Sequence, residues 1–590
     1  MAELQAVRKE WLLMPHDREA IDRLARASEL PPLVAQLLLN RNVENVPQAK
    51  RFLSAPFSGL YLPDQLPGVV AAVDLIMAAI NRRAKICVYG DYDVDGITGT
   101  SILYTTLRHM GADVQYYLPK RLEEGYGVNV QALRTLAASG VQLVITVDCG
   151  IASLEEAREA RKLGLELIVT DHHTMKAELP EAAVCVHPRL PNTSYPFGEL
   201  SGAGVAFKLS WALAVRHCGS EKVTPAFREV LLNSVGLATL GLIADVVPME
   251  DENRIIVRAG MKHLRQSPSL GMKALMEAAK LLSDKPLRSS DVGFRLAPRM
   301  NAAGRLGCAA MVVEMLTTNS ADKAKEIAEY LESQNSERQS IERKMFQQAK
   351  ELLAEQPLDT MPAAVLAHPE WHPGVVGILA SRIVDFLGRP AIMFAQVPDK
   401  EVITGSGRSI TGFKLNEALQ ACDHLLEGYG GHPMAVGAKI RPENLARFRE
   451  MFQNYARANF PNAMPRPPRL NIDAEVPLNV WSYRLLDQLD LLEPYGPGNP
   501  EPKFLTGDLQ VVGSPRRVGG GERTLSFSVK QGNTRMRAVG FNMGERLEEL
   551  MSEEGRCCLV YKPVINEWND QTSIQLQVVD FQAGPTATLA

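Results

Sequence analysis

The stretch Gly90-Asp91-Tyr92-Asp93-Val94-Asp95-Gly96 decides the fold and the chemistry of the region around it. Residues 86–89 before it are an apolar run of strand formers, and residues 97–110 after it have the pattern of a helix closed by Gly111. In extended backbone alternate residues face the same way, which brings the three carboxylates into one space. Like charges held that close repel one another unless a cation lies between them, and Mg²⁺ or Mn²⁺ suits oxygen ligands. An acidic surface turn or a weak calcium loop explains this stretch alone equally well.

Strands and helices alternate from about residue 82 to residue 250. The candidate strands are residues 85–90, 113–119, 141–147, 165–170 and 183–187. Strands that alternate with helices at this spacing predict a doubly wound parallel sheet. In such sheets ligands gather beyond the carboxyl ends of the strands.

Acidic residues and histidines follow several of these apolar runs. The strand at 141–147 is followed by Asp148, and the strand at 165–170 by Asp171-His172-His173. The apolar run at 240–244, which we also expect to be a strand, is followed by Asp245. A single Asp at a strand end is most often a helix cap or a turn residue. Together with the acidic stretch that follows residues 86–89, this makes four such ends in one sheet. Four are hard to explain by capping alone, so the sequence predicts a dinuclear metal centre.

The length and composition exclude several classes of protein. A chain of 590 residues is too long for one ordinary core, so we expect three or four domains. The net charge of −4 argues against a uniformly basic nucleic-acid coat but is compatible with a local basic groove. Lys9 and Glu10 interrupt any signal peptide, and no run of 18 uncharged apolar residues suggests a membrane span. The eight cysteines show no CxxC spacing, which indicates a reduced, cytoplasmic protein with no membrane association.

The rest of the chain divides by pattern into four further parts. Residues 1 to about 80 look helical and are expected to pack against the first α/β domain. Residues 321–355 lack Pro and Gly and predict one long helix, on the order of 50 Å. A second α/β unit follows, with apolar strands near 363–367, 391–395 and 434–440. It contains two glycine-rich stretches, residues 404–409 and 428–433, which we expect to be turns that approach a phosphate, although a lone turn of this kind is usually only a turn.

The C-terminal part is rich in β-strand patterns. Residues 525–529 and 536–539 alternate, and a helical stretch at 544–553 comes before strands near 557–566 and 572–581. This order is typical of a five-stranded OB barrel. The candidates for contacts to phosphates and bases are Arg516, Arg517, Arg523, Arg535, Arg537, Phe541, Tyr561 and Trp568. The alternative is that the aromatic residues form the barrel core, which is favoured for Phe527.

The motifs resemble those of the DHH phosphoesterase superfamily, which carries the pattern of residues 91–96 together with Asp171-His172-His173. Residues 120–127 (KRLEEGYG), 298–305 (PRMNAAGR) and 430–432 (GGH) narrow the resemblance to its bacterial exonucleases that degrade single-stranded DNA from the 5′ end. The resemblance extends from about residue 35 to residue 580, and the motifs follow one another in the order expected for that family. Pyrophosphatase-type members carry a His four residues before the Asp-x-Asp pair, where this chain has Tyr89, and Asp91 is the candidate for that ligand role.

The resemblance implies an α/β architecture: a doubly wound DHH domain, a long connecting helix, a second α/β DHH-associated domain and a C-terminal OB barrel. The implied boundaries, after the N-terminal segment 1–80, are 81–318, 319–357, 358–462 and 463–590. It implies two Mn²⁺ or Mg²⁺ ions held by Asp91, Asp93, Asp95, Asp148, His172 and Asp245. Asp148 as the bridging ligand and His173 beside the scissile phosphate are the implied catalytic residues. The implied nucleic-acid-binding residues are Arg121, Arg305, Ser406, Arg408, Gly431 and His432.

The implied reaction is the release of 5′-mononucleotides from single-stranded DNA, in DNA repair and recombination, by a monomer that works with a helicase and a single-stranded-DNA-binding protein. Two rivals remain. A phosphodiesterase for short oligonucleotides or cyclic dinucleotides needs only the two α/β domains, so the barrel argues against it. A non-catalytic single-strand-binding scaffold needs no cluster of unpaired carboxylates, so the intact ligand set argues against that.

Overall fold

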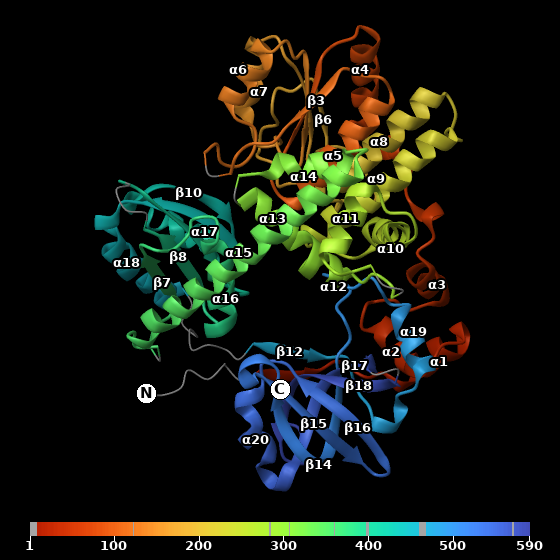
Figure 1. Cartoon of the computed structure of the whole chain (residues 1–590), viewed down its shortest axis with the longest axis vertical. Coiled ribbons are helices and arrows are strands. Elements are labelled where there is room, and N and C mark those ends of the chain that lie inside the picture. The colour runs from red at the N-terminus through yellow and green to blue at the C-terminus, as the bar shows by residue number, and fades with distance from the viewer. Residues whose placement is uncertain are drawn as a thin grey trace. The chain divides into compact units, whose positions relative to one another are not determined.

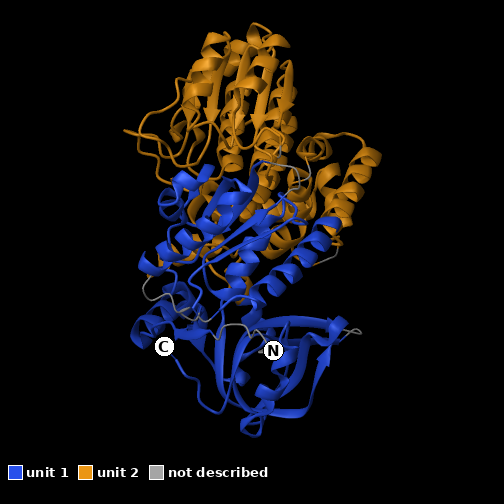
Figure 2. Cartoon of the chain, turned by 90° about the vertical axis from the view of Figure 1, so that its left-hand side faces the viewer, with its two compact units in different colours: residues 1–42, 337–488, 502–590 blue, residues 43–336, 489–501 orange. Residues whose placement is uncertain are grey.

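A computed structural model describes residues 9–121, 123–282, 285–305, 307–358, 360–396, 401–459, 468–568 and 571–589. The chain divides into two compact units (Figure 2). Unit 1 contains residues 1–42, 337–488 and 502–590, and unit 2 contains residues 43–336 and 489–501.

Unit 2 is built on a five-stranded parallel sheet in the order β3-β2-β4-β5-β6 (Figure 1). Its strands are β2 (Ile86–Gly90), β3 (Val114–Tyr117), β4 (Leu143–Val147), β5 (Glu166–Thr170) and β6 (Val184–Val186). The predicted doubly wound parallel sheet is confirmed. Gly90 pairs with Val147, so the residues that follow β2 and β4 emerge side by side at the carboxyl edge.

Helices pack on both sides of this sheet and extend the unit. They are α3 (Val46–Ser54), α4 (Val69–Asn81), α5 (Val94–His109), α6 (Val130–Ala138), α7 (Leu154–Lys162), α8 (Gly202–Cys218), α9 (Pro225–Ala244), α10 (Asp251–Gln266), α11 (Leu270–Ala278), α12 (Ser289–Asp291), α13 (Ala297–Arg305) and α14 (Ala309–Thr317). Helix α5 follows the acidic turn and begins at its N-cap, Asp93. Gly96 is required in the first turn, because a Cβ there would lie 2.6 Å from the carbonyl oxygen of Asp91.

Helix α9 is the one helix of the described residues that is long and apolar enough to cross a membrane; the bent pair 57–65 and 69–81 passes the same test only when it is taken as a single span. More than half of the apolar window of α9, 56%, is buried inside the protein. It packs against α5, α8 and α10, as a core helix does.

The long helix predicted for residues 321–355 is present as α15 (Ala321–Ala354). It begins in unit 2 and ends in unit 1. In unit 1 it is followed by a five-stranded sheet in the order β10-β11-β9-β8-β7. The strands are β7 (Ala364–His368), β8 (Ala391–Ala395), β9 (Ile403–Arg408), β10 (Leu426–His432) and β11 (Ala435–Ile440), and the helices are α16 (Val376–Leu387), α17 (Leu415–Gln420) and α18 (Leu445–Asn459).

The prediction that the two glycine-rich stretches are turns was wrong. Residues 403–408 form the central strand β9, and residues 426–432 form the edge strand β10. Glycine weakens a strand, so its local pattern favours a turn. Here the pairing of both strands with β11 decides the structure.

The C-terminal part of unit 1 is the predicted OB barrel. Its strands are β13 (Ala474–Glu475), β14 (Phe504–Val518), β15 (Thr524–Gln531), β16 (Thr534–Gly540), β17 (Arg556–Trp568) and β18 (Gln571–Ala583), and its helix is α20 (Leu547–Met551). The same stretch of chain contains β12 (Arg469–Ile472), which lies in a separate sheet, and α19 (Tyr483–Asp490), whose last two residues belong to unit 2. The additional pairing of β14 with β17 closes the sheet. A helix before the last two strands is confirmed.

The N-terminal segment differs from the expectation of a helical region on the first α/β domain. Helices α3 and α4 lie in unit 2, but β1 (Glu10–Leu13), α1 (Arg18–Ser28) and α2 (Pro32–Leu39) lie in unit 1. Strand β1 pairs in parallel with β12. The buried indole of Trp11 donates a hydrogen bond from Nε1 to Asp580 Oδ2 at 2.9 Å. Its partners lie more than 400 residues away in the sequence, so no local pattern indicates this pairing.

Candidate metal centre

The carboxyl edge of the parallel sheet gathers most of the predicted ligands. Asp91 follows β2, Asp148 follows β4, and residues 171–173 follow β5. Asp148 has φ of 62°, a left-handed conformation that an aspartate tolerates better than most residues. The sheet therefore delivers these side chains to one space, as predicted from the strand ends.

Asp245 reaches the same space from a different element. The run 240–244 is the last part of helix α9, and Asp245 is its C-cap, so the expectation of a strand end was wrong. Gly241 brings this helix close to the acidic turn, because a Cβ on Gly241 would lie 2.3 Å from Asp95 Oδ1.

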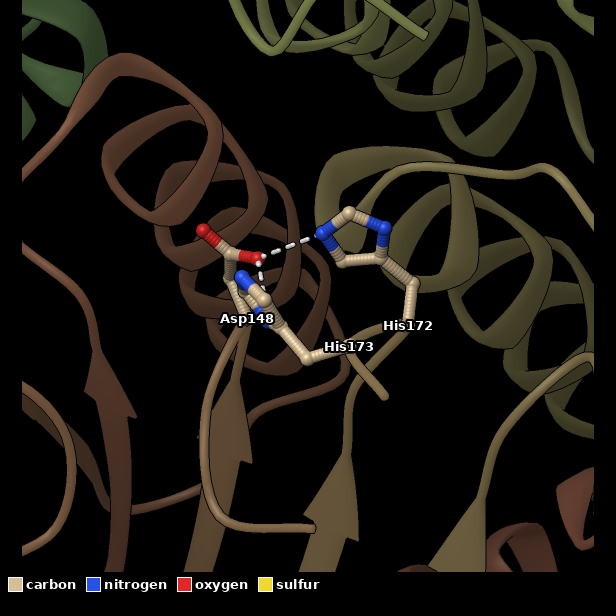
Figure 3. Close-up of side chains that lie close together, drawn as sticks. All are labelled: Asp148, His172 and His173. Carbon is tan, nitrogen blue, oxygen red and sulfur yellow. Dashed lines mark ion pairs between the residues drawn. The ribbon is translucent and has the colours of Figure 1, made fainter. Parts of the chain in front are cut away.

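His172 lies at the centre of the cluster. Its Nε2 is 3.1 Å from Asp148 Oδ1, 3.5 Å from Asp245 Oδ2 and 3.9 Å from Asp95 Oδ2. Figure 3 shows that the rings of His172 and His173 turn toward the same oxygen of Asp148, with His173 Nδ1 at 3.7 Å. The ligand atoms form three groups in which all atoms lie within 4.8 Å of one another. These groups are Asp148 with His172 and His173, Asp95 with His172 and Asp245, and Asp91 with Asp93 and Asp148.

Three buried atoms of this cluster form no hydrogen bond: Asp91 Oδ1, Asp148 Oδ1 and His172 Nε2. The last two lie 3.1 Å apart, but their contact does not have the geometry of a hydrogen bond. An unpaired buried polar atom is costly, and two carboxylate oxygens with an imidazole nitrogen are a donor set that divalent cations accept. The residues therefore fit a metal site.

Asp93 and Asp95 also have structural contacts. Asp93 Oδ1 accepts hydrogen bonds from the backbone amides of Asp95 and Gly96, which caps α5. Asp95 accepts three, from Ser201 Oγ at 2.7 Å, Gly202 N at 2.6 Å and Ala203 N at 3.1 Å. Sequence reasoning missed this anchor at the start of α8. The Ser-Gly-Ala-Gly run before an apolar helix marks it as a helix start but gives no sign of its partner.

The carboxylates carry strongly perturbed acidities. Burial, followed by the charge of Asp93, raises the pKa of Asp91 well above its usual range. Burial and the charge of Asp95 do the same to the pKa of Asp148. Burial, with the charges of Asp95 and Asp93, raises the pKa of Asp245 to about 8. Negative charge in this space is thus unfavourable until a cation compensates it.

The two histidines differ in protonation. Burial lowers the pKa of His172 to about 4, so its imidazole is neutral and suited to a ligand. Burial alone would lower the pKa of His173 too, but its hydrogen bond to Asp171, 2.8 Å from Nδ1, and nearby negative charges raise it to about 9. Asp171 also accepts hydrogen bonds from the amides of His172 and His173 and of Ile151. Its position supports the histidines.

Tyr126 belongs to the site, although no role was predicted for it from the sequence. Its hydroxyl donates to the backbone carbonyl of Asp148 at 3.2 Å, and its ring contacts His173 edge to face at 5.8 Å. The ring of Tyr126 also contacts that of Tyr92 edge to face at 6.4 Å, and Arg121 stacks on Tyr92 with 5.0 Å to the ring centroid. Helix α13, which ends at Arg305, packs against Tyr92, since a Cβ on Gly304 would lie 2.3 Å from its carbonyl oxygen.

The other predicted nucleic-acid-binding residues lie in unit 1. Arg408 Nη1 donates to Ser406 Oγ at 3.0 Å, and both residues lie beside Gly377 in the first turn of α16. Gly431 has φ of 130°, and a Cβ there would lie 2.4 Å from the carbonyl oxygen of Ala435. His432, at the end of β10, is exposed.

The barrel candidates divide between surface and core. Arg516, Arg517, Arg523, Arg535 and Arg537 are exposed, as is Phe541. Phe527 is buried, which confirms the core interpretation for it. Tyr561 is also buried, with its hydroxyl bonded to Trp481 Nε1 and Thr506 Oγ1, so its proposed contact with bases was wrong. The side chain of Trp568 lies outside the described residues.

Three sequence families match consecutive parts of the chain. The family described as "DHH family, N-terminal domain" matches residues 85–235, the "DHHA1 domain" matches residues 360–458 and the "RecJ OB domain" matches residues 472–580.

Complete proteins match as well. The single-stranded-DNA-specific exonuclease RecJ of Bacillus subtilis is 37% identical, over 98% of this chain and 71% of that protein. Its namesake from Escherichia coli is 34% identical, over 95% of this chain and 97% of that protein. The crystal structure of RecJ from Thermus thermophilus in complex with Mn²⁺ covers 99% of this chain, with 80% of that chain matched, a TM-score of 0.82 and 32% identity. The same protein in complex with Mg²⁺ gives a TM-score of 0.75.

Proposed function

This chain belongs to the RecJ family of the DHH phosphoesterases, and from that premise we propose that it is an exonuclease specific for single-stranded DNA. It degrades the strand from the 5′ end to 5′-mononucleotides, in DNA repair and recombination. The observation that carries the proposal is the convergence of carboxylates and imidazoles at the sheet edge, with three buried atoms that lack a hydrogen bond.

Two ions, Mn²⁺ or Mg²⁺, are assigned to Asp91, Asp93, Asp95, Asp148, His172 and Asp245. Asp148 belongs both to the group with Asp91 and Asp93 and to the group with the two histidines, which supports its assignment as the bridge. When bound, the ions stabilise charge on the scissile phosphate and activate the attacking water. Asp95, held by three hydrogen bonds to the start of α8, fixes the site against the mutual repulsion of its carboxylates.

His173 is the proposed acid. Its raised pKa keeps the imidazole protonated at neutral pH. Because Nδ1 is bonded to Asp171, Nε2, which lies 3.4 Å from the hydroxyl of Tyr126, is the atom assigned to the substrate. A proton at that atom stabilises the charge that develops on the leaving oxygen, or is transferred to it. Tyr126 packs on the same ring and holds its orientation.

The terminal 5′-phosphate is assigned to Arg121, Arg305, Ser406 and Arg408, with Gly431 and His432 beside the first nucleotide. Guanidinium groups form charge-assisted hydrogen bonds with phosphate, and the hydroxyl of Ser406 beside Arg408 is a further donor. Recognition of an end phosphate makes an exonuclease rather than an endonuclease, because an internal phosphate cannot present the same charge.

The exposed arginines of the barrel are assigned to the backbone of a longer single strand. A helicase and a single-stranded-DNA-binding protein are the proposed partners of a cytoplasmic monomer.

One digestion tests the function. The purified protein is given 5′-labelled and 3′-labelled single strands, a duplex and a cyclic dinucleotide, with Mn²⁺ or Mg²⁺. We expect the 5′ label to be released first as a mononucleotide, the 3′-labelled strand to shorten, and the duplex to survive. Preferred cleavage of the cyclic dinucleotide would identify a small-substrate phosphodiesterase, and binding without cleavage would identify a scaffold.

A further inference from the structure

Residues 489–501, which we call the strap (Leu489–Glu501), belong to unit 2, whereas the chain on either side of them belongs to unit 1 (Figure 2). The strap has a fixed conformation of its own. The amide of Gly496 donates to the carbonyl oxygen of Asn499 at 2.9 Å, and the reverse bond is 3.1 Å. The buried Asn499 also donates from Nδ2 to the carbonyl oxygens of Leu492 and Pro494, each at 2.8 Å.

One buried arginine of helix α10 holds the strap in place. Arg254 is 2% exposed, and its guanidinium lies over the ring of Phe52 at 3.9 Å. Its two terminal nitrogens donate to four consecutive carbonyl oxygens of the strap, those of Leu491 (3.2 Å), Leu492 (2.9 Å), Glu493 (3.0 Å) and Pro494 (3.3 Å). A lysine has the charge but not the planar fork that these bonds require.

The strap rests on the loop that follows Asp245. The amide of Met249, four residues after Asp245, donates to the carbonyl oxygen of Pro497 at 2.7 Å. Gly498, with a φ of +75°, lies against the side chain of Glu250, whose Oε1 would be 2.3 Å from a Cβ at this position. The backbone that carries Asp245 is therefore fixed between helix α9 and the strap.

The first turn of α10 extends this contact to the anchor of Asp95. Asn253 donates from Nδ2 to the carbonyl oxygen of Pro248 at 3.0 Å and to that of Glu199 at 2.6 Å. Glu199 stands two residues before Ser201, which donates to Asp95. Neighbouring residues of one helical turn thus contact the strap, the loop after Asp245 and the segment that anchors Asp95.

We propose that the strap positions Asp245, and that it thereby sets the affinity of the site for its metal ions. Asp245 lies 3.5 Å from the imidazole of His172, at a helix end rather than on the sheet, so its place depends on the loop after it. The strap is continuous in sequence with the barrel, so a segment of the barrel region is part of the support of the metal centre. The inference rests on the proposed function, because it assumes that Asp245 is a metal ligand.

The test is Mn²⁺ binding by Arg254→Lys, measured by isothermal titration with the full chain and without DNA. Loss of a residue that positions a metal ligand typically weakens metal binding by about 10-fold to 100-fold, and we expect a loss in this range. Arg258→Lys is the matched control, since Arg258 lies one turn further along α10 and donates one hydrogen bond to the strap, to the carbonyl oxygen of Leu491 at 3.2 Å. We expect it to bind Mn²⁺ as the parent chain does.

A second pair of variants covers the case in which Arg254→Lys fails to fold. Asn499→Ala removes the two hydrogen bonds from Nδ2 to the carbonyl oxygens of Leu492 and Pro494. Asn459→Ala is its control, because it removes a similar bond from an exposed asparagine of α18 to the carbonyl oxygen of Tyr455 at 3.0 Å. We expect weaker Mn²⁺ binding in the first only, and a nuclease activity that excess Mn²⁺ restores.

A merely structural strap predicts a different result. The thermal unfolding temperature would fall in Arg254→Lys and Asn499→Ala, while the folded protein would bind Mn²⁺ with unchanged affinity, and that outcome overturns the proposal. If the exonuclease function itself is wrong, the parent chain fails to degrade single strands, yet the comparison of Mn²⁺ affinities still decides the role of the strap.

Discussion

Removal of the metal ions should make the stability of unit 2 fall as the pH rises from 6 to 8. The carboxyl of Asp245 has a pKa of about 8 in the folded chain, against an ordinary value of 3.8. Between these values the folded state keeps a proton that the unfolded state has released. The contribution of Asp245 to the stability is therefore fully present below its ordinary pKa, and it is lost as the pH rises through the pKa of the folded state.

The size of this effect follows from the shift. Each pH unit inside the window costs up to about 1.4 kcal/mol. Because the folded carboxyl is half ionised at pH 8, the loss from pH 6 to pH 8 is roughly 2 kcal/mol, or a few degrees in Tm. Bound Mn²⁺ reverses the trend, since it pairs with the ionised carboxylates and binds better as they lose protons.

The assay is thermal unfolding at pH 6, 7 and 8, in chelator and in Mn²⁺, for the parent chain, Asp245→Asn and a control, Asp322→Asn. Asp322 is exposed in the first turn of α15. In chelator we expect the Tm of the parent chain and of Asp322→Asn to fall with pH more steeply than that of Asp245→Asn. Equal slopes for all three would show that the carboxyl of Asp245 is not held in its protonated form, and the argument would fail.

Three further predictions concern catalysis and binding. Asp148→Ala and Asp95→Ala should abolish cleavage while circular dichroism shows a folded chain, and Asp95→Ala should also unfold at a lower temperature because the donors of α8 lose their acceptor; activity at any metal concentration would contradict the two-ion assignment. Arg408→Ala should lose about 1.5–3 kcal/mol of binding to 5′-phosphorylated strands; an equal loss on 5′-hydroxyl strands would place its contact elsewhere. The double variant Arg535→Ala, Arg537→Ala should weaken binding to long strands and lower the salt dependence, measured by fluorescence anisotropy; unchanged affinity for long strands would remove the barrel from the binding role.

The sequence was sufficient to predict the sheet edge because each strand there is a short apolar run with a polar residue directly after it. Asp91, Asp148 and the pair His172-His173 were identified in this way, and the structure brings them together. The same rule misassigned the element before Asp245, because a short apolar run does not distinguish a buried strand from the end of a buried helix. The residue was found although its element was wrong.

Contacts between distant segments could not be predicted. Ser201 donates to Asp95 across 106 positions, and Arg254 reaches the strap across more than 230. A serine before a helix and an arginine within one have common local explanations, as a cap and as a solvated charge. Only the folded structure shows that Ser201 is buried against a carboxylate of the metal centre and that Arg254 is buried against the strap.

Residues 489–501 belong to unit 2 although their neighbours in the sequence belong to unit 1, and this limits how the DNA-binding role of the barrel can be tested. A chain ended near residue 463 loses the strap, which leaves Arg254 buried without its four carbonyl acceptors. It also loses β12, the partner of β1. Such a truncation would reduce activity on every substrate, even if the barrel served only to bind long strands. Point variants of the exposed Arg535 and Arg537 keep both segments, so a loss confined to long strands, with a trinucleotide still degraded, isolates the binding role of the barrel; an equal loss on the trinucleotide would show that these arginines support the metal centre instead.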